Sequence, residues 1–351
     1  MKILFVTDAW RPQINGVVRT LEELIRELQA FGFEIETITP DQFMTVPTPG
    51  YPEIRLALVL SGMLRRRIEE VNPDHIHIAT EGPLGTAARS ACLRTRRTFT
   101  SSYHTRFPEY LRARVPIPLA WTYAWLRRFH NSGTACLVAT RSIADDLESR
   151  GFNNVVPWTR GVDHDLFKPR KQSELGIGLD WKRPVFVNVG RVSVEKNLEA
   201  FLSLDLPGTK LIVGDGPARN MLEKKYPEAI FAGAKSGLEL AKYYNAADVF
   251  VFPSLTDTFG NVLLEALASG LPVAAFPVPG PLDVIGDSDA GILDNDLKKA
   301  AVAALDIPSK AAVKYASKFT WNECARIFLQ SAKIPAYSDE PSGSLVSSSE
   351  N

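Results

Sequence analysis

Residues 252–270 have the sequence FPSLTDTFGNVLLEALASG, and they carry the strongest structural signal in the chain. An apolar run that ends at Phe252 predicts a buried strand, and a loop with Asp257 follows it. A helix is then expected to begin near Gly260 or Asn261 and to stop at Gly270. A strand–loop–helix unit of this kind is the repeating element of parallel α/β folds.

The start of this predicted helix is suited to a polar ligand, because its first N–H groups lack partners and the helix dipole is positive there. The donors concerned belong to Thr258, Phe259, Gly260 and Asn261. Glu265 lies about one turn into the helix, eight residues after Asp257. The two carboxylates can therefore hold different parts of one elongated ligand. The alternative is a capping Asp257 and a solvated Glu265.

Short apolar runs alternate with amphipathic segments through almost the whole chain, as in the helical patterns at 17–31 and 238–246. Strand–helix alternation is typical of parallel sheets that carry helices on both faces. We predict an α/β protein with two Rossmann-like, doubly wound domains that face each other across a ligand-binding cleft. Strands are expected at 2–7, 34–39, 75–79, 98–103, 136–139, 154–158, 185–189, 210–214, 229–232, 248–252, 272–276 and 291–293.

The length of 351 residues fits two domains of ordinary size. The alternating pattern restarts around residues 160–182, where prolines and glycines indicate a linker. The final residues are rich in serine and poor in apolar side chains, which is typical of disorder. The expected divisions are an N-terminal domain at 1–165, a C-terminal ligand-binding domain at 166–318, a helix at 319–334 that packs back on the first domain, and a disordered tail at 335–351.

The composition argues against several classes of protein. Forty basic and forty acidic side chains cancel, so the net charge predicts no nucleic-acid partner. Cys92, Cys136 and Cys324 are too few and too widely spaced for a disulfide framework or a zinc site, which favours a reducing cytoplasm. No apolar stretch approaches the roughly 20 residues that span a bilayer. We therefore expect a cytoplasmic protein that does not cross a membrane.

Two cations follow the first predicted strand of the C-terminal half. Residues 190–197 have the sequence GRVSVEKN, which places Arg191 and Lys196 at a strand–helix junction. Cations beside a helix start stabilise a phosphorylated ligand as its negative charge increases. An ordinary solvated pair is the alternative interpretation.

Small residues end the neighbouring strands of the same half. Gly190 ends one strand, Gly214 and Gly216 form a tight turn after the next, and Ala232 ends a third. The turn is similar to a dinucleotide-binding fingerprint, but Arg219 occupies its third glycine position. An oxidoreductase is therefore disfavoured.

Fewer candidates for ligand binding lie in the N-terminal half. Gly16 and Arg19 lie in the first strand–helix crossover. The alternative interpretation of Arg19 is a solvated helix residue. His104 follows a predicted strand at its carboxyl end, where α/β folds hold ligands, so we favour a functional role over a structural one. His75 and His77 alternate within one strand without a matched third ligand, and we interpret both as structural.

Residues 252–270 resemble the signature of retaining glycosyltransferase family 4, in which seven residues separate an acidic residue from Glu. Asp257 stands at the first position, where the family usually has Glu, and Glu265 stands at the second. The shorter carboxylate bears on the identity of the sugar and not on the class of reaction. The resemblance covers nearly the whole chain and implies the GT-B architecture of two Rossmann-like domains.

The resemblance also implies a role for each candidate residue. Asp257 would contact hydroxyls of the donor sugar, and Glu265 would contact the ribose of the nucleotide. Arg191 and Lys196 would bind the diphosphate, and His104 would face the reacting sugar. The other implied donor-binding residues are Gly16, Gly190, Gly214, Gly216, Ala232, Thr258, Phe259, Gly260 and Asn261.

Basic and aromatic side chains gather between residues 65 and 128. Arginines beside tryptophans and tyrosines are typical of a surface that binds an anionic bilayer, although solvated helix faces would have the same composition. This region resembles the branch of the family that glycosylates lipids, including bacterial diacylglycerol glycosyltransferases. The predicted membrane contacts are Arg112, Arg114, Trp121, Trp125, Arg127 and Arg128.

The resemblance predicts transfer of glucose, glucuronic acid or mannose, with retention of configuration, from a nucleoside-diphosphate donor to an acceptor hydroxyl. We expect a UDP-linked donor, a membrane lipid such as diacylglycerol as acceptor, and a peripheral location on the inner face of the cell membrane. The alternative is a GDP-mannose-dependent mannosyltransferase that acts on a lipid or polysaccharide. A sugar-nucleotide epimerase and a non-catalytic binding protein represent other classes. No metal and no further cofactor is expected.

Overall fold

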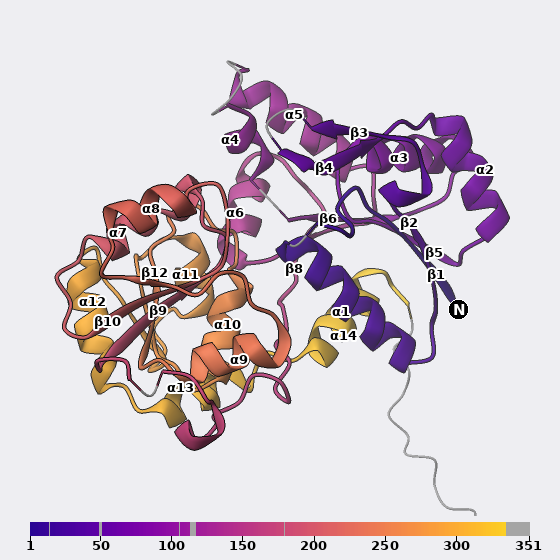
Figure 1. The fold of residues 1–351 in the computed structure, drawn as a ribbon. Coiled ribbons are helices and arrows are strands. Elements are labelled where there is room, and N and C mark those ends of the chain that lie inside the picture. Colours follow the sequence, from indigo (N-terminus) through magenta and orange to yellow (C-terminus); the bar gives the residue numbers. More distant parts are fainter. Residues whose placement is uncertain (14, 49–50, 105, 113–116, 179, 335–351) are drawn as a thin grey trace, which may run out of the picture.

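The computed structural model describes residues 1–13, 15–48, 51–104, 106–112, 117–178 and 180–334. Figure 1 shows two α/β bodies, the first drawn in indigo to magenta and the second in red to orange. Each body contains a parallel sheet of six strands. The prediction of two Rossmann-like, doubly wound sheets is therefore confirmed, whereas the residue boundaries between the domains stay a prediction.

The N-terminal sheet has the strand order β2-β1-β5-β6-β7-β8. Successive residues of a strand point to opposite faces, and β1 supplies both cores of this domain. Ile3 and Phe5 pack with helices α1 (Gly16–Ala30) and α14 (Trp321–Ser331), whereas Leu4 and Val6 pack with α2 (Ser61–Val71) and α3 (Pro83–Thr95). The strands are β1 (Lys2–Val6), β2 (Glu34–Ile38), β5 (His75–Ile78), β6 (Thr100–Tyr103), β7 (Ala135–Val138) and β8 (Val155–Pro157).

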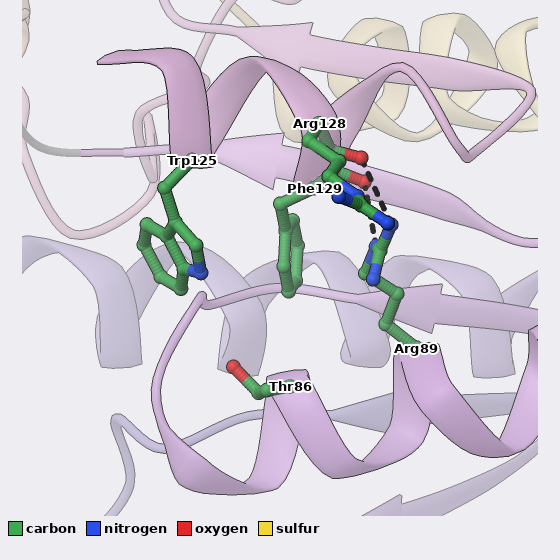
Figure 2. Close-up of a pocket in the computed structure, with 5 residues that line it drawn as sticks. All are labelled: Thr86, Arg89, Trp125, Arg128 and Phe129. Atoms are coloured by element: carbon green, nitrogen blue, oxygen red, sulfur yellow. Dashed lines mark hydrogen bonds between the residues drawn. The ribbon is translucent and has the colours of Figure 1, made fainter. Parts of the chain in front are cut away.

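The helices of this domain are α1 (Gly16–Ala30), α2 (Ser61–Val71), α3 (Pro83–Thr95), α4 (Phe107–Arg112), α5 (Leu119–His130) and α6 (Arg141–Ser149). Two cavities lie beside α3. The α2–α3 pocket, of about 530 Å³, lies between the first turns of α3 and residues 59–61. The α3–α5 pocket, of about 290 Å³, is lined by Thr86 and Arg89 from α3 and by Trp125, Arg128 and Phe129 from α5 (Figure 2).

The C-terminal sheet has the order β11-β10-β9-β12-β13-β14. Its strands are β9 (Val185–Val189), β10 (Thr209–Val213), β11 (Ile230–Phe231), β12 (Val249–Phe252), β13 (Val273–Ala275) and β14 (Gly291–Leu293). Its helices are α7 (Leu198–Leu202), α8 (Arg219–Lys225), α9 (Gly237–Asn245), α10 (Asn261–Ala268), α11 (Pro279–Val284), α12 (Leu297–Ala303) and α13 (Ser309–Ala316). Short 3-10 helices lie at Pro40–Gln42, Gln172–Glu174, Val194–Lys196 and Ala304–Asp306.

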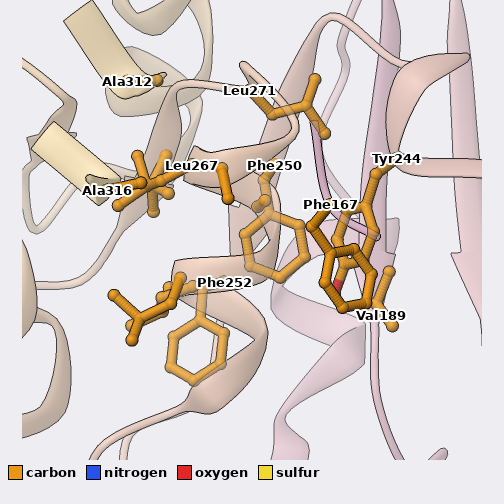
Figure 3. Close-up of a cluster of buried hydrophobic side chains, with 14 of the residues drawn as sticks. Phe167, Val189, Tyr244, Phe250, Phe252, Leu267, Leu271, Ala312 and Ala316 are labelled. Carbon is orange, nitrogen blue, oxygen red and sulfur yellow. The ribbon is translucent and has the colours of Figure 1, made fainter. Parts of the chain in front are cut away.

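A large apolar cluster fixes helix α10 on one face of this sheet. Phe250 and Phe252 of β12 lie beside Leu267 of α10 and Tyr244 of α9 (Figure 3). All four side chains are almost completely buried. Burial of side chains this large stabilises the domain by about 1.5–3 kcal/mol each, so the start of α10 is held rigidly at the carboxyl end of β12.

Helix α14 (Trp321–Ser331) leaves the C-terminal body and lies beside α1. The Trp158 indole donates to the carbonyl of Cys324 at 2.9 Å, and Phe328 packs against Phe5. Gly161 lies at the chain crossing, because a Cβ there would come within 2.2 Å of the Trp321 nitrogen. The end of the described chain therefore packs in the N-terminal core.

The sequence analysis missed an antiparallel hairpin of β3 (Thr45–Thr48) and β4 (Tyr51–Ala57). Pro47 interrupts the first strand, and a proline usually argues against a strand because it lacks an N–H donor. The pair forms a separate sheet of two strands, which is where such a proline is tolerated. The predicted tail at 335–351 lies outside the described residues.

Candidate active site

Helix α10 begins at Asn261, and Gly260 precedes it with φ +84°, a conformation that favours glycine. No side chain among the described residues caps this helix start, so its first N–H groups stay available to a ligand. Helix α11 packs closely against the preceding loop, because a Cβ on Gly280 would lie 2.8 Å from the carbonyl oxygen of Asp257. The loop that contains Thr258 and Phe259 therefore lies between the starts of α10 and α11.

Asp257 pairs with Lys196 at the carboxyl edge of the C-terminal sheet. The Lys196 Nζ lies 2.5 Å from Asp257 Oδ1, and Asp257 Oδ2 is buried without a partner among the described residues. Asn197 donates to the carbonyl of Pro253 at 3.0 Å and joins the two loops. Asp257 therefore does not cap a helix. Lys196 binds one of its carboxylate oxygens, and the other oxygen has no partner among the described residues.

Glycines allow three strand ends of this sheet to approach one another. A Cβ on Gly214 would lie 1.8 Å from the Gly190 carbonyl oxygen, and one on Gly216 would lie 2.4 Å from that of Val192. The backbone of Ala232 follows on the next strand and donates to Ile212 at 2.9 Å. Arg191 is exposed on the loop after β9. These loops form a compact edge beside Lys196.

Glu265 is only 2% exposed and lies in contact with both domains. Its Oε1 pairs with Arg19 of α1, and its Oε2 accepts a hydrogen bond from the Tyr244 hydroxyl at 2.9 Å. Burial raises the pKa of Glu265, and Arg19 and Tyr244 oppose that rise. The alternative interpretations are therefore wrong: Glu265 is not solvated, and Arg19 is half-buried in an ion pair.

Two other contacts bring the N-terminal loops to the start of α10. A Cβ on Gly16 would lie 3.8 Å from the Asn261 side-chain nitrogen. The Thr258 hydroxyl donates to the carbonyl of His104 at 3.0 Å. Gly16 follows β1 and His104 follows β6, so the carboxyl edges of both sheets meet at α10.

The side chain of His104 has a defined protonation state. Arg160 Nη2 lies 3.4 Å from His104 Nδ1, and a guanidinium can only donate, so Nδ1 is the acceptor and Nε2 carries the proton. Burial, the charge of Arg160 and His130 hold the pKa of His104 well below its usual range. Nε2 is buried and has no partner among the described residues. His104 is thus a neutral N–H donor.

Arg160 was missed by the sequence analysis. It is 3% exposed, donates to the Trp158 carbonyl at 2.6 Å, and lies over the Trp158 ring. The Phe259 ring centroid is 6.0 Å away. Its position at the end of a predicted strand is the signal that could have identified it, because ligands bind at such ends. Tyr244 had no comparable signal.

His75 and His77 form a buried network with Thr100, whose hydroxyl lies 2.9 Å from a ring nitrogen of each. The second nitrogen of His77 bonds Ser102 at 2.8 Å. Burial lowers the pKa of His75 to about 4. No group of three or more His, Cys, Asp or Glu side chains that could hold a metal ion occurs within the described residues.

The predicted membrane contacts that the structure describes lie on α4 and α5. Trp121 and Trp125 are 73% and 43% exposed on α5, and Arg127 and Arg128 are also exposed there. Arg112 is exposed at the end of α4, whereas Arg114 lies outside the described residues. In the part of the chain that the structure describes, no helix combines the length and the apolar character needed to span a bilayer.

Comparison with known proteins decides the family. The model described as Glycosyltransferase Family 4 matches residues 14–166, and the one described as Glycosyl transferases group 1 matches residues 183–307. A GDP-mannose-dependent alpha-mannosyltransferase of Corynebacterium glutamicum is 30% identical over 87% of this chain and 80% of its own length. The chain belongs to glycosyltransferase family 4.

Two other relatives and a solved structure are similar to this family 4 glycosyltransferase. Sulfoquinovosyl transferase SQD2 of Arabidopsis thaliana is 33% identical, and the match covers 82% of this chain but 62% of the plant protein. Alpha-monoglucosyldiacylglycerol synthase of Streptococcus pneumoniae is 27% identical over 87% of this chain and 78% of its own length. The sucrose-phosphate synthase structure from Thermosynechococcus elongatus has a TM-score of 0.74 at 20% identity, covering 94% and 97% of the chains.

These similarities establish two points. The solved structure shows the GT-B fold for the family 4 chain, as the resemblance implied. Family membership makes the protein a retaining glycosyltransferase that uses a nucleotide-sugar donor.

Proposed function

We propose that this enzyme transfers mannose from GDP-mannose to a hydroxyl group of a membrane lipid. The observation that carries the proposal is the 30% identity to a GDP-mannose-dependent alpha-mannosyltransferase over 80% of that relative's length. This donor replaces the UDP-linked one that the sequence analysis favoured. The lipid acceptor is supported by the exposed tryptophans and arginines of α5 and by the similarity to a diacylglycerol-glycosylating enzyme.

The donor would bind at the start of α10. Arg191, Lys196 and the free N–H groups of the helix would bind the diphosphate, as expected for an anion at a helix N-terminus. The partnerless Oδ2 of Asp257 would accept a hydrogen bond from a sugar hydroxyl. The Nε2–H group of His104 would donate to another oxygen of the same sugar.

Glu265 would accept hydrogen bonds from the ribose hydroxyls. Each carboxylate oxygen offers two lone-pair positions, but Arg19 and Tyr244 already occupy one position on each and exclude solvent. The ribose would therefore bind after α1 moves away from α10. The small residues at 190, 214, 216 and 232 would line the donor edge.

The reaction would place positive charge on the sugar and negative charge on the leaving diphosphate. Arg191 and Lys196 would stabilise that negative charge where it develops, which is the largest contribution a rigid site makes. The acceptor hydroxyl would attack the face from which the diphosphate leaves, and its proton would pass to a diphosphate oxygen. Retention of configuration follows from this shared face.

A second candidate is transfer of glucose or glucuronic acid from a UDP-linked donor to diacylglycerol. The similarity to alpha-monoglucosyldiacylglycerol synthase favours it. In both candidates the protein would bind the inner face of the cell membrane through Arg112, Arg114, Trp121, Trp125, Arg127 and Arg128, with no nucleic acid as partner. Peripheral binding of this kind uses aromatic rings and cations together.

The test compares donors first and acceptors second. Thermal unfolding is measured with GDP-mannose, UDP-glucose and UDP-glucuronic acid, and we expect the largest stabilisation with GDP-mannose. Transfer to dioctanoylglycerol in mixed micelles is then measured with the same donors. Selective stabilisation by a UDP-sugar would instead support the second candidate. A product formed without acceptor would indicate an epimerase, and binding without transfer or hydrolysis would indicate a binding protein.

A further inference from the structure

The α2–α3 pocket lies beside the part of the N-terminal domain that faces α10. Glu81, at its edge, follows β5, and β5 lies between β1 and β6 in the sheet. The loops after β1 and β6 carry Gly16 and His104, both of which contact the start of α10. The loop of Glu81 therefore leaves the sheet between the two loops that meet the donor domain.

The position of Glu81 is fixed by a buried histidine. His130 is completely buried, its Nε2 lies 3.1 Å from Glu81 Oε1, and its Nδ1 lies 2.9 Å from the Ser101 hydroxyl. Glu81 Oε2 has no protein donor among the described residues, and the side chain is 18% exposed. Among the residues that line the α2–α3 pocket, Glu81 is the one ionisable group. It is thus a positioned acceptor of hydrogen bonds in a largely apolar pocket.

The α3–α5 pocket continues the same surface, because Thr86 lines both pockets. Figure 2 shows the Arg89 guanidinium turned toward the backbone of α5, where it donates to the Arg128 carbonyl at 3.0 Å. Arg89 also donates to the Ser132 hydroxyl at 2.8 Å. Nε and one Nη of Arg89 are therefore bonded to α5 and Ser132, and the ring of Trp125, which is 43% exposed, provides an apolar wall. This end therefore offers an apolar ring for a hydrocarbon chain beside the two arginines.

We propose that the two pockets along α3 form the acceptor site. Glu81 accepts hydrogen bonds from the hydroxyls of a polyol headgroup, which directs one hydroxyl toward the cleft. The apolar chain of the same molecule lies along the exposed ring of Trp125 and leaves at the exposed face of α5. The proposal rests on the lipid acceptor proposed above and identifies its class as a glycerolipid with at least one free hydroxyl.

A bulky side chain at Thr86 tests the site with little cost to folding, because Thr86 is exposed at the junction of the pockets. In the full-length protein, Thr86→Phe should lower kcat/KM for dioctanoylglycerol by about tenfold or more, because the bulky ring would block the junction of the two pockets. KM for GDP-mannose and the rate of donor hydrolysis should stay within about twofold of the wild-type values. Leu93→Phe is the matched control, since Leu93 is 47% exposed on α3 and lines neither pocket.

A second variant and a direct label separate the possible failures. Glu81→Gln, which keeps the shape, should raise KM for dioctanoylglycerol without changing GDP affinity. A diazirine in the acyl chain should label peptides from residues 83–95 and 119–130 of the wild-type protein. Labels elsewhere, or full activity of Thr86→Phe, would overturn the acceptor site. A wild-type protein that binds GDP-mannose yet transfers nothing to lipid would instead overturn the proposed function.

Discussion

The two carboxylates near the start of α10 have opposite environments. Asp257 precedes the helix, pairs with Lys196 of its own domain and keeps one oxygen without a protein partner among the described residues. Glu265 lies inside the helix, and both of its oxygens are taken, one of them by Arg19 of the other domain. The difference indicates that the sugar end of the proposed donor site is formed in this conformation, whereas the N-terminal domain closes the ribose end.

The largest effect is expected at the formed end of the site. Arg191→Ala should lower kcat by roughly 10²-fold, or about 3 kcal/mol, because the leaving diphosphate loses a cation that acts mainly in the transition state. Steady-state kinetics with the preferred donor provide the measurement. Lys224→Ala, at an exposed position on α8, is the matched control. Unchanged kinetics of the Arg191 variant would remove the diphosphate assignment.

A smaller loss is expected at the closed end. Glu265→Gln keeps a partner for Tyr244 but removes the charge that the ribose hydroxyls would contact. The Kd of GDP should rise by about tenfold, or 1.4 kcal/mol, as measured by titration calorimetry. Equal affinity of variant and wild type would show that Glu265 serves only as the partner of Arg19 and Tyr244.

Arg19→Met should change GDP affinity in the other direction. Because Arg19 occupies Glu265 Oε1 in the closed arrangement, its removal should favour the open state and lower the Kd of GDP by about threefold. A radius of gyration from X-ray scattering should increase in the unliganded variant. A loss of affinity equal to that of Glu265→Gln would mean that Arg19 assists the nucleotide and does not compete with it.

The smallest effect is a dependence of stability on pH. The pKa of Glu265 is raised in the folded protein above its ordinary value of 4.5. The folded state therefore holds a proton that the unfolded state has released, and stability decreases as pH rises from 4.5 through the folded pKa. Urea unfolding should show Glu265→Gln gaining stability relative to wild type across that window. A constant difference would contradict the raised pKa.

The fold and the positions of several candidate residues within it could be predicted because their signals are local. Apolar runs fix the strands, and the segment from Phe252 to Gly270 fixes a strand end, a loop and a helix start within 19 residues. Each candidate at a strand end was placed by the rule that parallel strands share one carboxyl edge. The sequence positions of Asp257 and Lys196 were therefore sufficient to expect them together.

The contacts between the domains could not be predicted. Arg19 and Glu265 are separated by 246 residues, and no local pattern pairs them. Arg160 and Tyr244 are buried against residues of other elements. Composition does not reveal contacts of this kind. The hairpin of β3 and β4 was missed because Pro47 obscures the strand pattern.

Hydrogen–deuterium exchange with and without GDP-mannose tests most directly whether the start of α10 and the loop after β9 bind the donor. The account predicts slower exchange in peptides that cover residues 190–197 and 257–266, with faster exchange at the start of α1 as Arg19 leaves Glu265. Protection confined to other segments, or none at saturating donor, would contradict it.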